Sequence, residues 1–582
     1  MSKIRLAVLL LLCCLVGVGI LTVTATASVQ TSTDGPAVDA GEPAALASVT
    51  PSDRLVSQQL ASAHVDTCAA TPPADHADPP GGTSETIGWV DGYWYSEALD
   101  IEGPAIDEDE LEALVARTAA RVEALRCLTF DEVPPTELLT REEYGTSVEA
   151  FFTNLSTDEW RFDDARLATL LIAGQAVDAK DLRIEAQTAF PAAFYDTEEQ
   201  YMGFITDDPS TIEINQVTLA HELLHALQDQ HFDLRQIFDE PTNDRFISSL
   251  AIVEGDAVLV DSQYEANCDG AWSDACILTE PSAPGEIPSY ALVLNQLAAY
   301  NMPLVEAVYD EDGWDGVNAL LDEMPDSTIE TLYPEQYGSF QPVSLTVDDE
   351  SSDAWERIAY EGPTGEQITY DVIGQHGLTA ILVAPSFETQ GNFNIVNPFD
   401  FQPHVGGDFN YDVPETSGWQ GDKLYAYAND AGDNASVWKL AWSDSDEAET
   451  FADAYTELIE YRGGSLADGY ENVYTFDQSD EYEMAVAIER AGDRLLIVTA
   501  PTVEALTNVH EGLTLLDADA DVPTPTPIDE TPTHTPDADR PSPTPLPHDT
   551  PTPSPDGIPG FGVVITVITV LAVTLLAHRL WR

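Results

Sequence analysis

The residues best suited to chemistry lie in the stretch LAHELLHALQDQHFDL, from Leu219 to Leu234. It contains His221, Glu222 and His225 in the pattern H-E-x-x-H. On a helix, two histidines four positions apart share one face, with Cβ atoms about 5–6 Å apart. That spacing suits two imidazoles binding one Zn²⁺ ion, and it places the glutamate where it can reach a water at the metal. The pattern predicts a zinc site with His221 and His225 as ligands and Glu222 as the catalytic base.

A catalytic zinc ion needs a third protein ligand, and the sequence offers two candidates. His231 follows His225 at the metzincin spacing, H-E-x-x-H-x-x-G-x-x-H, but Gln228 occupies the position of the glycine at which the chain leaves the helix. Glu254 lies in the apolar segment AIVEGDAVLV, where a buried charge requires a partner. A glutamate from a second helix completes the His₂Glu set of gluzincins. Glu254 is the predicted third ligand and His231 the alternative.

The charge balance limits the possible functions. The 582 residues include 103 acidic and 22 basic side chains, for a net charge of -81. Nucleic-acid binding needs the opposite sign, so we expect no nucleic-acid partner. The hydrophobic content of 43% is sufficient for folded cores. A carboxylate-covered surface of this kind predicts stability that depends on salt, as in halophilic proteins. The abundance of acids also leaves open that Glu254 is an ordinary surface residue.

Several periodic segments must position these residues. Helical patterns occur at residues 107–130, 163–177, 244–266, 289–300 and 314–324, in addition to the histidine segment itself. Residues 193–208 read as strand, turn, strand. We expect the second of these strands, Tyr201–Thr206, to be an edge strand with which an extended peptide substrate could pair.

Residues 346–516 have a different character. Strand patterns precede and follow an acidic helix, SDEAETFADAYTELIEY, and a last helix begins at Thr502. This order predicts a second, smaller α+β sandwich domain, and we find no catalytic motif in it.

The two ends of the chain read as targeting segments. Residues 1–27 have a basic start, an apolar run and the small-residue site Ala25-Thr26-Ala27, which predicts a secretory signal peptide, with a retained membrane anchor as the alternative. Residues 28–85 read as a flexible, low-complexity lead-in. Residues 517–557 are rich in Pro, Thr and Asp and predict an extended stalk. Residues 558–582 contain an uncharged run followed by Arg579 and Arg582, which predicts a membrane-spanning helix.

The predicted export also indicates whether the cysteines form disulfides. Four remain after the predicted signal peptide. In an exported protein an even number predicts disulfides. Cys268 and Cys276 are the most plausible pair because they bracket one short loop, which would leave Cys68 with Cys127. Zinc binding by cysteines is the weaker alternative, since no C-x-x-C pattern occurs.

The C-terminal tail resembles the PGF-CTERM sorting signal of haloarchaeal surface proteins. It has Pro559-Gly560-Phe561, then an apolar stretch, then basic residues, all behind a Thr/Pro-rich stalk. The resemblance implies that an archaeosortase removes the helix and attaches a lipid. The mature protein would then be held at the membrane by that lipid and not by a transmembrane helix.

The central part of the chain resembles gluzincin-type metallopeptidases of bacteria and archaea. The resemblance covers roughly residues 90–345 and is carried by HELLHALQDQHFDL and VEGDA. It implies a zincin-like fold over 86–345, with zinc bound by His221, His225 and Glu254, and with Glu222 as base.

The sequence departs from the thermolysin-like pattern in one place. Those enzymes carry an aspartate four residues after the ligand glutamate, whereas this chain has Val258. Asp256 or Asp261 are the candidates to orient a histidine in its place. For the donor that would stabilise the oxyanion, the sequence offers only Tyr264 and His231.

These observations predict an α+β protein whose zincin-like domain is followed by a second domain, a stalk and a C-terminal hydrophobic helix. The expected function is that of an exported, membrane-anchored, cell-surface zinc metallopeptidase of a halophilic archaeon, acting on peptide or protein substrates. The alternative is a non-catalytic adhesion or cell-envelope protein that keeps the zincin fold.

Overall fold

The computed structural model describes residues 68–79, 85–101, 105–189, 193–206, 212–272, 276–277, 303–346, 348–362, 364–401, 409–476 and 482–516. The predicted signal peptide, stalk and C-terminal helix lie outside these residues, as does most of the predicted lead-in. In the part of the chain that the structure describes, no helix combines the length and apolar character needed to cross a bilayer. The described chain mixes helices and sheets, which confirms the α+β class at that level.

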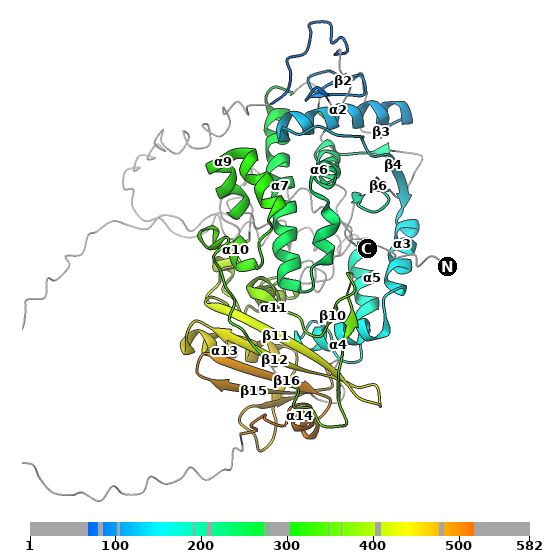
Figure 1. Cartoon of the computed structure of the whole chain (residues 1–582). Helices are drawn as coiled ribbons and strands as arrows, with labels where there is room; N and C mark the ends of the chain where they lie inside the picture. Colours follow the sequence, from blue (N-terminus) through cyan, green and yellow to red (C-terminus); the bar gives the residue numbers. More distant parts are fainter. Residues whose placement is uncertain are drawn as a thin grey trace, which may run out of the picture.

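Three packed helices form the core of the first region. The helices α6 (Gln216–Phe232) and α7 (Asn243–Asp269) run side by side, and α2 (Glu108–Arg126) crosses one end of both (Figure 1). A capping box between Asp107 and Glu110 begins α2. The predicted helix at 244–266 is thereby confirmed, and the one at 107–130 is confirmed up to Arg126, where α2 ends. Two short strand pairs complete this end of the molecule: β1 (Trp89–Val90) with β2 (Tyr93–Trp94), and β3 (Ala105–Ile106) with β7 (Ile212–Glu213).

A three-stranded sheet lies beside α6. Its order is β4 (Thr136–Thr140), β6 (Tyr201–Thr206), β5 (Ala193–Asp196), with β4 parallel and β5 antiparallel to β6. The predicted strand, turn and strand at 193–208 are confirmed. The expectation that Tyr201–Thr206 is an edge strand is wrong, because β6 is hydrogen-bonded on both sides. It is β5 that packs against α6.

Further helices surround this core. They are α3 (Arg141–Thr153), α4 (Thr157–Thr169), α5 (Ala179–Ala189), η2 (Leu234–Asp239), α9 (Pro303–Asp322), α10 (Thr328–Leu332) and η4 (Pro334–Gln336). The predicted helix at 314–324 is confirmed within α9, whereas the one at 289–300 lies outside the described residues. The prediction at 163–177 is right only for its first half, since α4 ends at Thr169.

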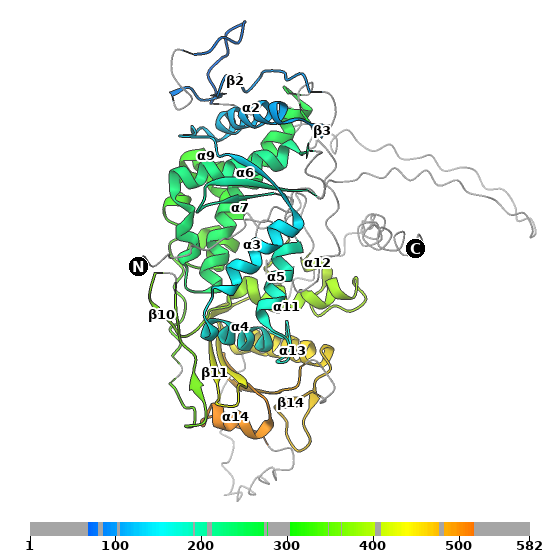
Figure 2. The ribbon, with the colours of Figure 1, turned by 90° about the vertical axis from the view of Figure 1, so that its right-hand side faces the viewer.

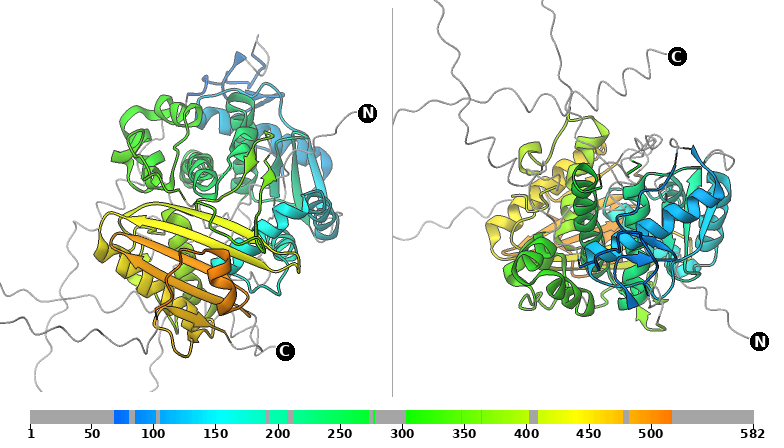
Figure 3. Two further views of the ribbon diagram at one scale, coloured as in Figure 1. Left: turned by 60° about the horizontal axis from the view of Figure 1, so that its bottom comes forward. Right: turned by 90° about the horizontal axis from the view of Figure 1, so that it is seen from above.

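The second region is built on a seven-stranded antiparallel sheet (Figure 3). Its order is β13 (Ser465–Leu466), β14 (Val473–Thr475), β15 (Ala485–Ala491), β16 (Arg494–Ala500), β12 (Asn434–Trp442), β11 (Trp419–Ala428), β8 (Glu356–Arg357). A separate hairpin joins β9 (Tyr360–Glu361) to β10 (Gln367–Ile368). The remaining helices are α11 (Gly374–Glu388), α12 (Pro398–Phe401), α13 (Ser445–Tyr461) and α14 (Val503–Val509). The predicted acidic helix is α13, and the helix predicted from Thr502 is α14.

Both faces of this sheet are buried, so its strands are apolar on both sides. Trp438 and Leu440 of β12 face one hydrophobic cluster together with α11 and α13. Val437, the residue next to Trp438, faces the other cluster, which includes Leu506 of α14. This alternation is the period-2 pattern of a pleated strand. Helices therefore cover the sheet on its two sides.

The two regions meet through α4, which comes from the first region in sequence but packs on the sheet of the second (Figure 2). Phe162 and Ala165 of α4 share a cluster with Ala426 of β11. The Thr169 hydroxyl hydrogen-bonds to Ser436 of β12 at 2.6 Å. The regions are thus joined by a common core, and the predicted boundary at 345/346 stays a prediction.

Two disulfide bonds cross-link segments of the first region. Cys68 is bonded to Cys127 and Cys268 to Cys276. Both are the pairs expected from the sequence, which confirms that prediction. The first ties the segment before β1 to the end of α2, and the second closes the end of α7.

Candidate metal centre

Helix α6 forms around the H-E-x-x-H pattern for local reasons. Asn215 caps its first turn by accepting hydrogen bonds from the amides of Val217 and Thr218. The chain leaves the helix only at Asp233, which has the left-handed φ of 52°. Gln228 is therefore an ordinary helical residue, and α6 has no break where a metzincin turns.

The histidines reach their positions because the rest of α6 is held in the core. Leu219, Leu223 and Leu227 are fully buried in the cluster that α6 shares with α2 and α7. His221 and His225 lie one turn apart, with ring centroids 4.6 Å apart. Both project toward α7.

Helix α7 supplies the carboxylates. Glu254 and Asp261 are seven residues apart, and two helical turns bring them to the same face. The first turn of α7 is fixed from the second region, because the amide of Asn243 donates to Asp371 Oδ1 at 2.7 Å and that of Asp244 donates to the Val372 carbonyl at 2.9 Å. The helix that carries Glu254 therefore begins at the junction of the two regions.

The three predicted ligands come together. His221 Nε2 lies 3.3 Å from Glu254 Oε2, and His225 Nε2 lies 3.8 Å from Glu254 Oε1. Ligand atoms of the three residues all fall within 4.8 Å of one another. Glu254 is 3% exposed and the histidines 2% and 0%, so the reading of Glu254 as a surface acid is wrong.

The other ring nitrogen of each histidine, Nδ1, is hydrogen-bonded to a neighbouring side chain. His221 Nδ1 lies 2.7 Å from Asp261 Oδ2, and His225 Nδ1 lies 2.9 Å from Gln228 Oε1. A carboxylate can only accept a hydrogen bond, so Nδ1 of His221 carries the proton and its Nε2 is left to bind a metal. His225 also carries its proton on Nδ1 and leaves Nε2 to the metal if Gln228 turns its side-chain oxygen toward it. The other contacts of Gln228 require that orientation.

Gln228 connects His225 to a buried ion pair. Its Nε2 donates to the Val253 carbonyl at 3.0 Å and to Asp256 Oδ2 at 2.9 Å, which leaves its oxygen for His225. Asp256 in turn pairs with Arg126 of α2, with Nε–Oδ1 at 2.9 Å and both side chains fully buried. The sequence left Asp256 and Asp261 as alternatives for orienting a histidine. The structure uses Asp261 for His221 directly and Asp256 for His225 through Gln228.

Burial and charge act differently on the two histidines. Desolvation lowers the pKa of His225 to about 4, with the charge of His221 acting in the same direction. Desolvation also lowers the pKa of His221, but Asp261 and Glu254 outweigh it and hold that pKa well above the usual value. Burial disfavours the ionised form of Glu254, yet the two histidines keep its pKa below the usual value. A divalent metal ion could bind this carboxylate and the two imidazoles, and its binding would release the extra proton that His221 holds.

These residues fit a divalent metal ion. Among the described residues, no hydrogen bond satisfies the Nε2 atoms of His221 and His225 or Oε2 of Glu254, although all three atoms are buried. Buried polar atoms of this kind need a partner. Two imidazole nitrogens and a carboxylate are the ligands that zinc prefers among nitrogen and oxygen donors.

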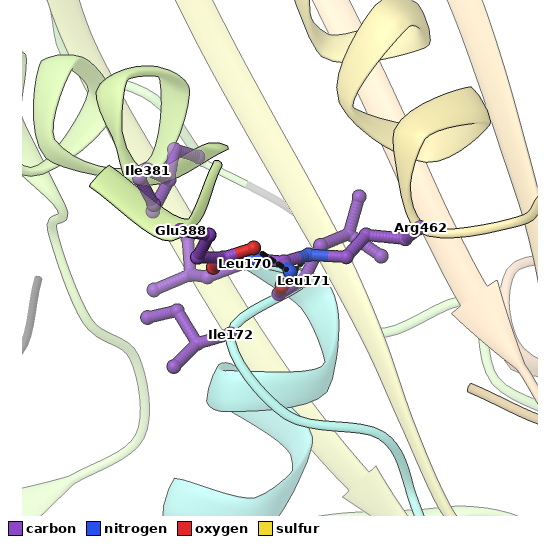
Figure 4. A pocket seen from close by; sticks show the side chains of 7 residues that line it. Leu170, Leu171, Ile172, Ile381, Glu388 and Arg462 are labelled. Carbon is purple, nitrogen blue, oxygen red and sulfur yellow. Dashed lines mark hydrogen bonds and ion pairs between the residues drawn. The ribbon is translucent and has the colours of Figure 1, made fainter. Parts of the chain in front are cut away.

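Glu222, the predicted base, is fully buried on the same helix, next to His221 in the chain. The centre as a whole is closed off, since none of its four principal side chains is more than 3% exposed. A small pocket elsewhere is lined by five apolar side chains, two of them from α11, together with Glu388 and Arg462 (Figure 4). There Arg462 pairs with Glu388 through two bonds of 2.7 and 2.8 Å, so these charged groups satisfy each other.

Two other sequence candidates are placed elsewhere. His231 lies exposed near the end of α6, with Nε2 2.9 Å from the Thr129 carbonyl, and it is not in the group of potential ligands. The hydroxyl of Tyr264 is buried and accepts a hydrogen bond from Arg121 at 3.1 Å. His231 is therefore not part of this centre, and the Tyr264 hydroxyl is held by Arg121 of α2.

Sequence reasoning missed the part played by Gln228 and Arg126. Gln228 was noticed only because it was not glycine, although its position three residues after His225 places it on the same helical face. No signal in the sequence pointed to Arg126, because its partner is 130 residues away.

Comparison with known proteins gives one partial match. Residues 359–510 match a family described as a domain of unknown function, DUF8575. The match lies within the seven-stranded sheet region and does not include the residues of the metal centre. No curated protein matches the chain. No solved structure matches it either.

Proposed function

We propose that the protein is a zinc-dependent metallopeptidase that hydrolyses peptide bonds at the centre formed by α6 and α7. The observation that supports this most is the convergence of three buried ligand atoms, from His221, His225 and Glu254, whose remaining bonds hold them in a metal-binding orientation. A purely structural zinc site would not need Glu222 beside the first ligand.

In the proposed mechanism each residue of the centre has its own role. His221, His225 and Glu254 would hold the ion, and Asp261 and Gln228 would fix the two imidazole rings. A zinc ion bound there supplies Lewis-acid polarisation of the substrate carbonyl and lowers the pKa of a water. Glu222 would accept the proton of the attacking water as the new C–O bond forms. It would then deliver that proton to the amine nitrogen as the C–N bond breaks.

The setting proposed for this activity is the cell surface of a halophilic archaeon. The support is the signal-like start of the chain, the Pro/Thr-rich segment before the tail and the PGF-CTERM-like end, together with the net charge of -81. The two disulfides agree with an oxidising compartment. Membrane attachment would come from the C-terminal helix or from a lipid that replaces it.

The experiment is to measure zinc content and peptide hydrolysis in high salt for the wild type, Glu222→Gln and Glu254→Gln. We expect one zinc per chain and hydrolysis in the wild type. Glu222→Gln should keep zinc and lose activity by at least about 100-fold, the lower end of what general acid–base catalysis contributes. Glu254→Gln should lose zinc, and the exposed Glu265→Gln on the same helix serves as its matched control. Wild-type protein without zinc would overturn the proposal.

One observation favours a second function, that of a non-catalytic surface protein that keeps a structural metal site. All three ligands and Glu222 are at most 3% exposed, and a peptide must reach the metal to be cleaved. The same experiment separates the two functions. Zinc in the wild type and in Glu222→Gln, with no hydrolysis by either of a mixed peptide library, would favour the structural site.

A further inference from the structure

Two arginines on α2 are buried, and neither forms an ion pair with a carboxylate of the residues that the structure describes. Arg117 is 1% exposed and Arg121 is fully buried. They are four residues apart and so share one face of the helix. The chain has 103 acidic residues for only 22 basic ones. An arginine in this protein can therefore find a carboxylate easily, which makes two buried arginines without an ion pair to any described residue unexpected.

The contacts of these side chains are to neutral groups. Arg121 donates to the Tyr95 carbonyl at 2.9 Å and to the Tyr264 hydroxyl at 3.1 Å, and its guanidinium lies 4.4 Å from the centre of the Trp272 ring. Arg117 donates to the Glu97 carbonyl at 3.3 Å. These contacts fix both guanidinium groups in place but do not balance their charge.

In the described part of the chain, neither guanidinium has a carboxylate within 4.0 Å, and three buried donors remain without an acceptor: Nε and Nη2 of Arg117 and Nη2 of Arg121. Arg126 on the same helix differs in charge balance, because it pairs with the buried Asp256, although its Nη1 and Nη2 also lack an acceptor among the described residues. Burial, followed by the charge of Arg121, lowers the pKa of Arg117 to about 10, and the charge of Glu97 opposes this shift without cancelling it. Two like charges held together in a desolvated site destabilise each other unless an anion lies between them.

We propose that Arg117 and Arg121 form a binding site for a small inorganic anion of the size of chloride. Such an anion would accept hydrogen bonds from the three unsatisfied donors and neutralise the pair. Because the two side chains are at most 1% exposed, a small ion suits the site better than the carboxylate of a peptide or a tetrahedral oxyanion. The site uses none of the metal-centre residues, so it stands or falls independently of the proposed peptidase activity.

The test compares anions at constant ionic strength, because salt of any kind will screen the repulsion within this acidic protein. Thermal unfolding of the full-length wild type is measured with sodium chloride, bromide, gluconate or sulfate, each adjusted to the same ionic strength. With chloride at about ten times its dissociation constant, we expect the unfolding midpoint to rise by about 2 °C over gluconate, because a fold of this size has a large entropy of unfolding. Bromide should act like chloride and sulfate like gluconate. Equal midpoints in chloride and gluconate would overturn the proposal, as would a larger effect of sulfate.

Two variants test whether the stabilisation by chloride arises at Arg117 and Arg121. Arg117→Met keeps the volume and removes one charge, and it should lose the difference between chloride and gluconate. Arg490→Met on β15 makes the same change at an exposed residue, 48% exposed at its side chain, and should keep the difference. If both variants keep it, the anion binds elsewhere and the assignment to Arg117 and Arg121 is wrong. The wild-type anion series stays decisive even where Arg117→Met does not fold.

Discussion

The α6–α7 region and the seven-stranded sheet bury different kinds of side chains. Between α6 and α7 lie two histidines and several carboxylates, with the Arg126–Asp256 pair behind them. The sheet instead buries aromatic rings, such as Trp438 against Phe451 and Tyr455. Burying charges costs free energy that apolar side chains of the same volume would not. The second region also buries single charged groups, such as Asp422 beside Trp438, but it does not gather imidazoles and carboxylates in one place as the α6–α7 region does. Such a gathering marks the α6–α7 region as the candidate site.

The sheet region is held together mainly by apolar packing and by hydrogen bonds between its elements. Its strands are buried on both faces, and its hydrogen bonds between side chains, such as Thr169 to Ser436, join elements without placing reactive groups together. We interpret it as the part that stabilises the junction and fixes the start of α7. The contrast can be tested by substitutions that should affect one region and not the other.

The largest effect should come from the sheet. Trp438 is fully buried, packs on Phe451 and Tyr455, and donates from Nε1 to Asp422 at 2.9 Å. Trp438→Ala should lower the free energy of unfolding by about 3–5 kcal/mol, because it creates a large cavity. Urea unfolding measures the loss, and Trp438→Phe should lose less. The protein that remains folded should bind zinc as the wild type does, and loss of zinc binding at equal folded fraction would contradict the division between regions.

A smaller effect is expected from the residues behind the histidines. Gln228→Met removes the acceptor for His225 Nδ1 and should lower zinc affinity about 10–100-fold, since ligand orientation is lost while the three ligands remain. Competition with a chelator of known affinity measures it. His231→Gln changes an exposed histidine on the same helix and should leave the affinity unchanged. A similar loss in both variants would show that His231 takes part after all.

The smallest effect should appear at the junction, as a dependence on pH. Asp163 is desolvated, which would raise its pKa, but its pairs with Arg166 and Arg183 hold the pKa far below the usual value. Arg166 also bonds Asp371, the residue that anchors the start of α7. A carboxyl whose pKa is lower in the folded state stabilises the fold above its unfolded pKa of about 3.9, and the stabilisation is lost as the pH falls further.

Asp163→Asn should therefore be less stable than the wild type by about 1–3 kcal/mol at pH 6, and the difference should shrink between pH 4 and pH 2. Chemical denaturation at each pH measures both proteins, and their difference removes the contribution of the other carboxylates. A difference that stays constant down to pH 2 would show that Asp163 acts by packing and not by charge.

Much of the fold could be predicted from local patterns. The helical periods of α2, α7 and α13 and the strand, turn and strand of β5 and β6 are visible because each element must bury one face or both. The sequence did not reveal which strand is at the edge of a sheet, because Tyr201–Thr206 has the same pattern whether one or two neighbours pair with it. Nor did it show that α4 would pack on a sheet formed by residues more than 250 positions away.

The sequence by itself determined the identity and spacing of the two histidines and their glutamate, since a helix fixes what shares a face. It also singled out Glu254, because a charge in an apolar segment needs a partner. Only the tertiary structure decided that Asp261 holds His221 and that Gln228, Asp256 and Arg126 form a chain behind His225. Those contacts join α2, α6 and α7 across long stretches of sequence, and no local pattern encodes which polar groups will meet when separate helices pack.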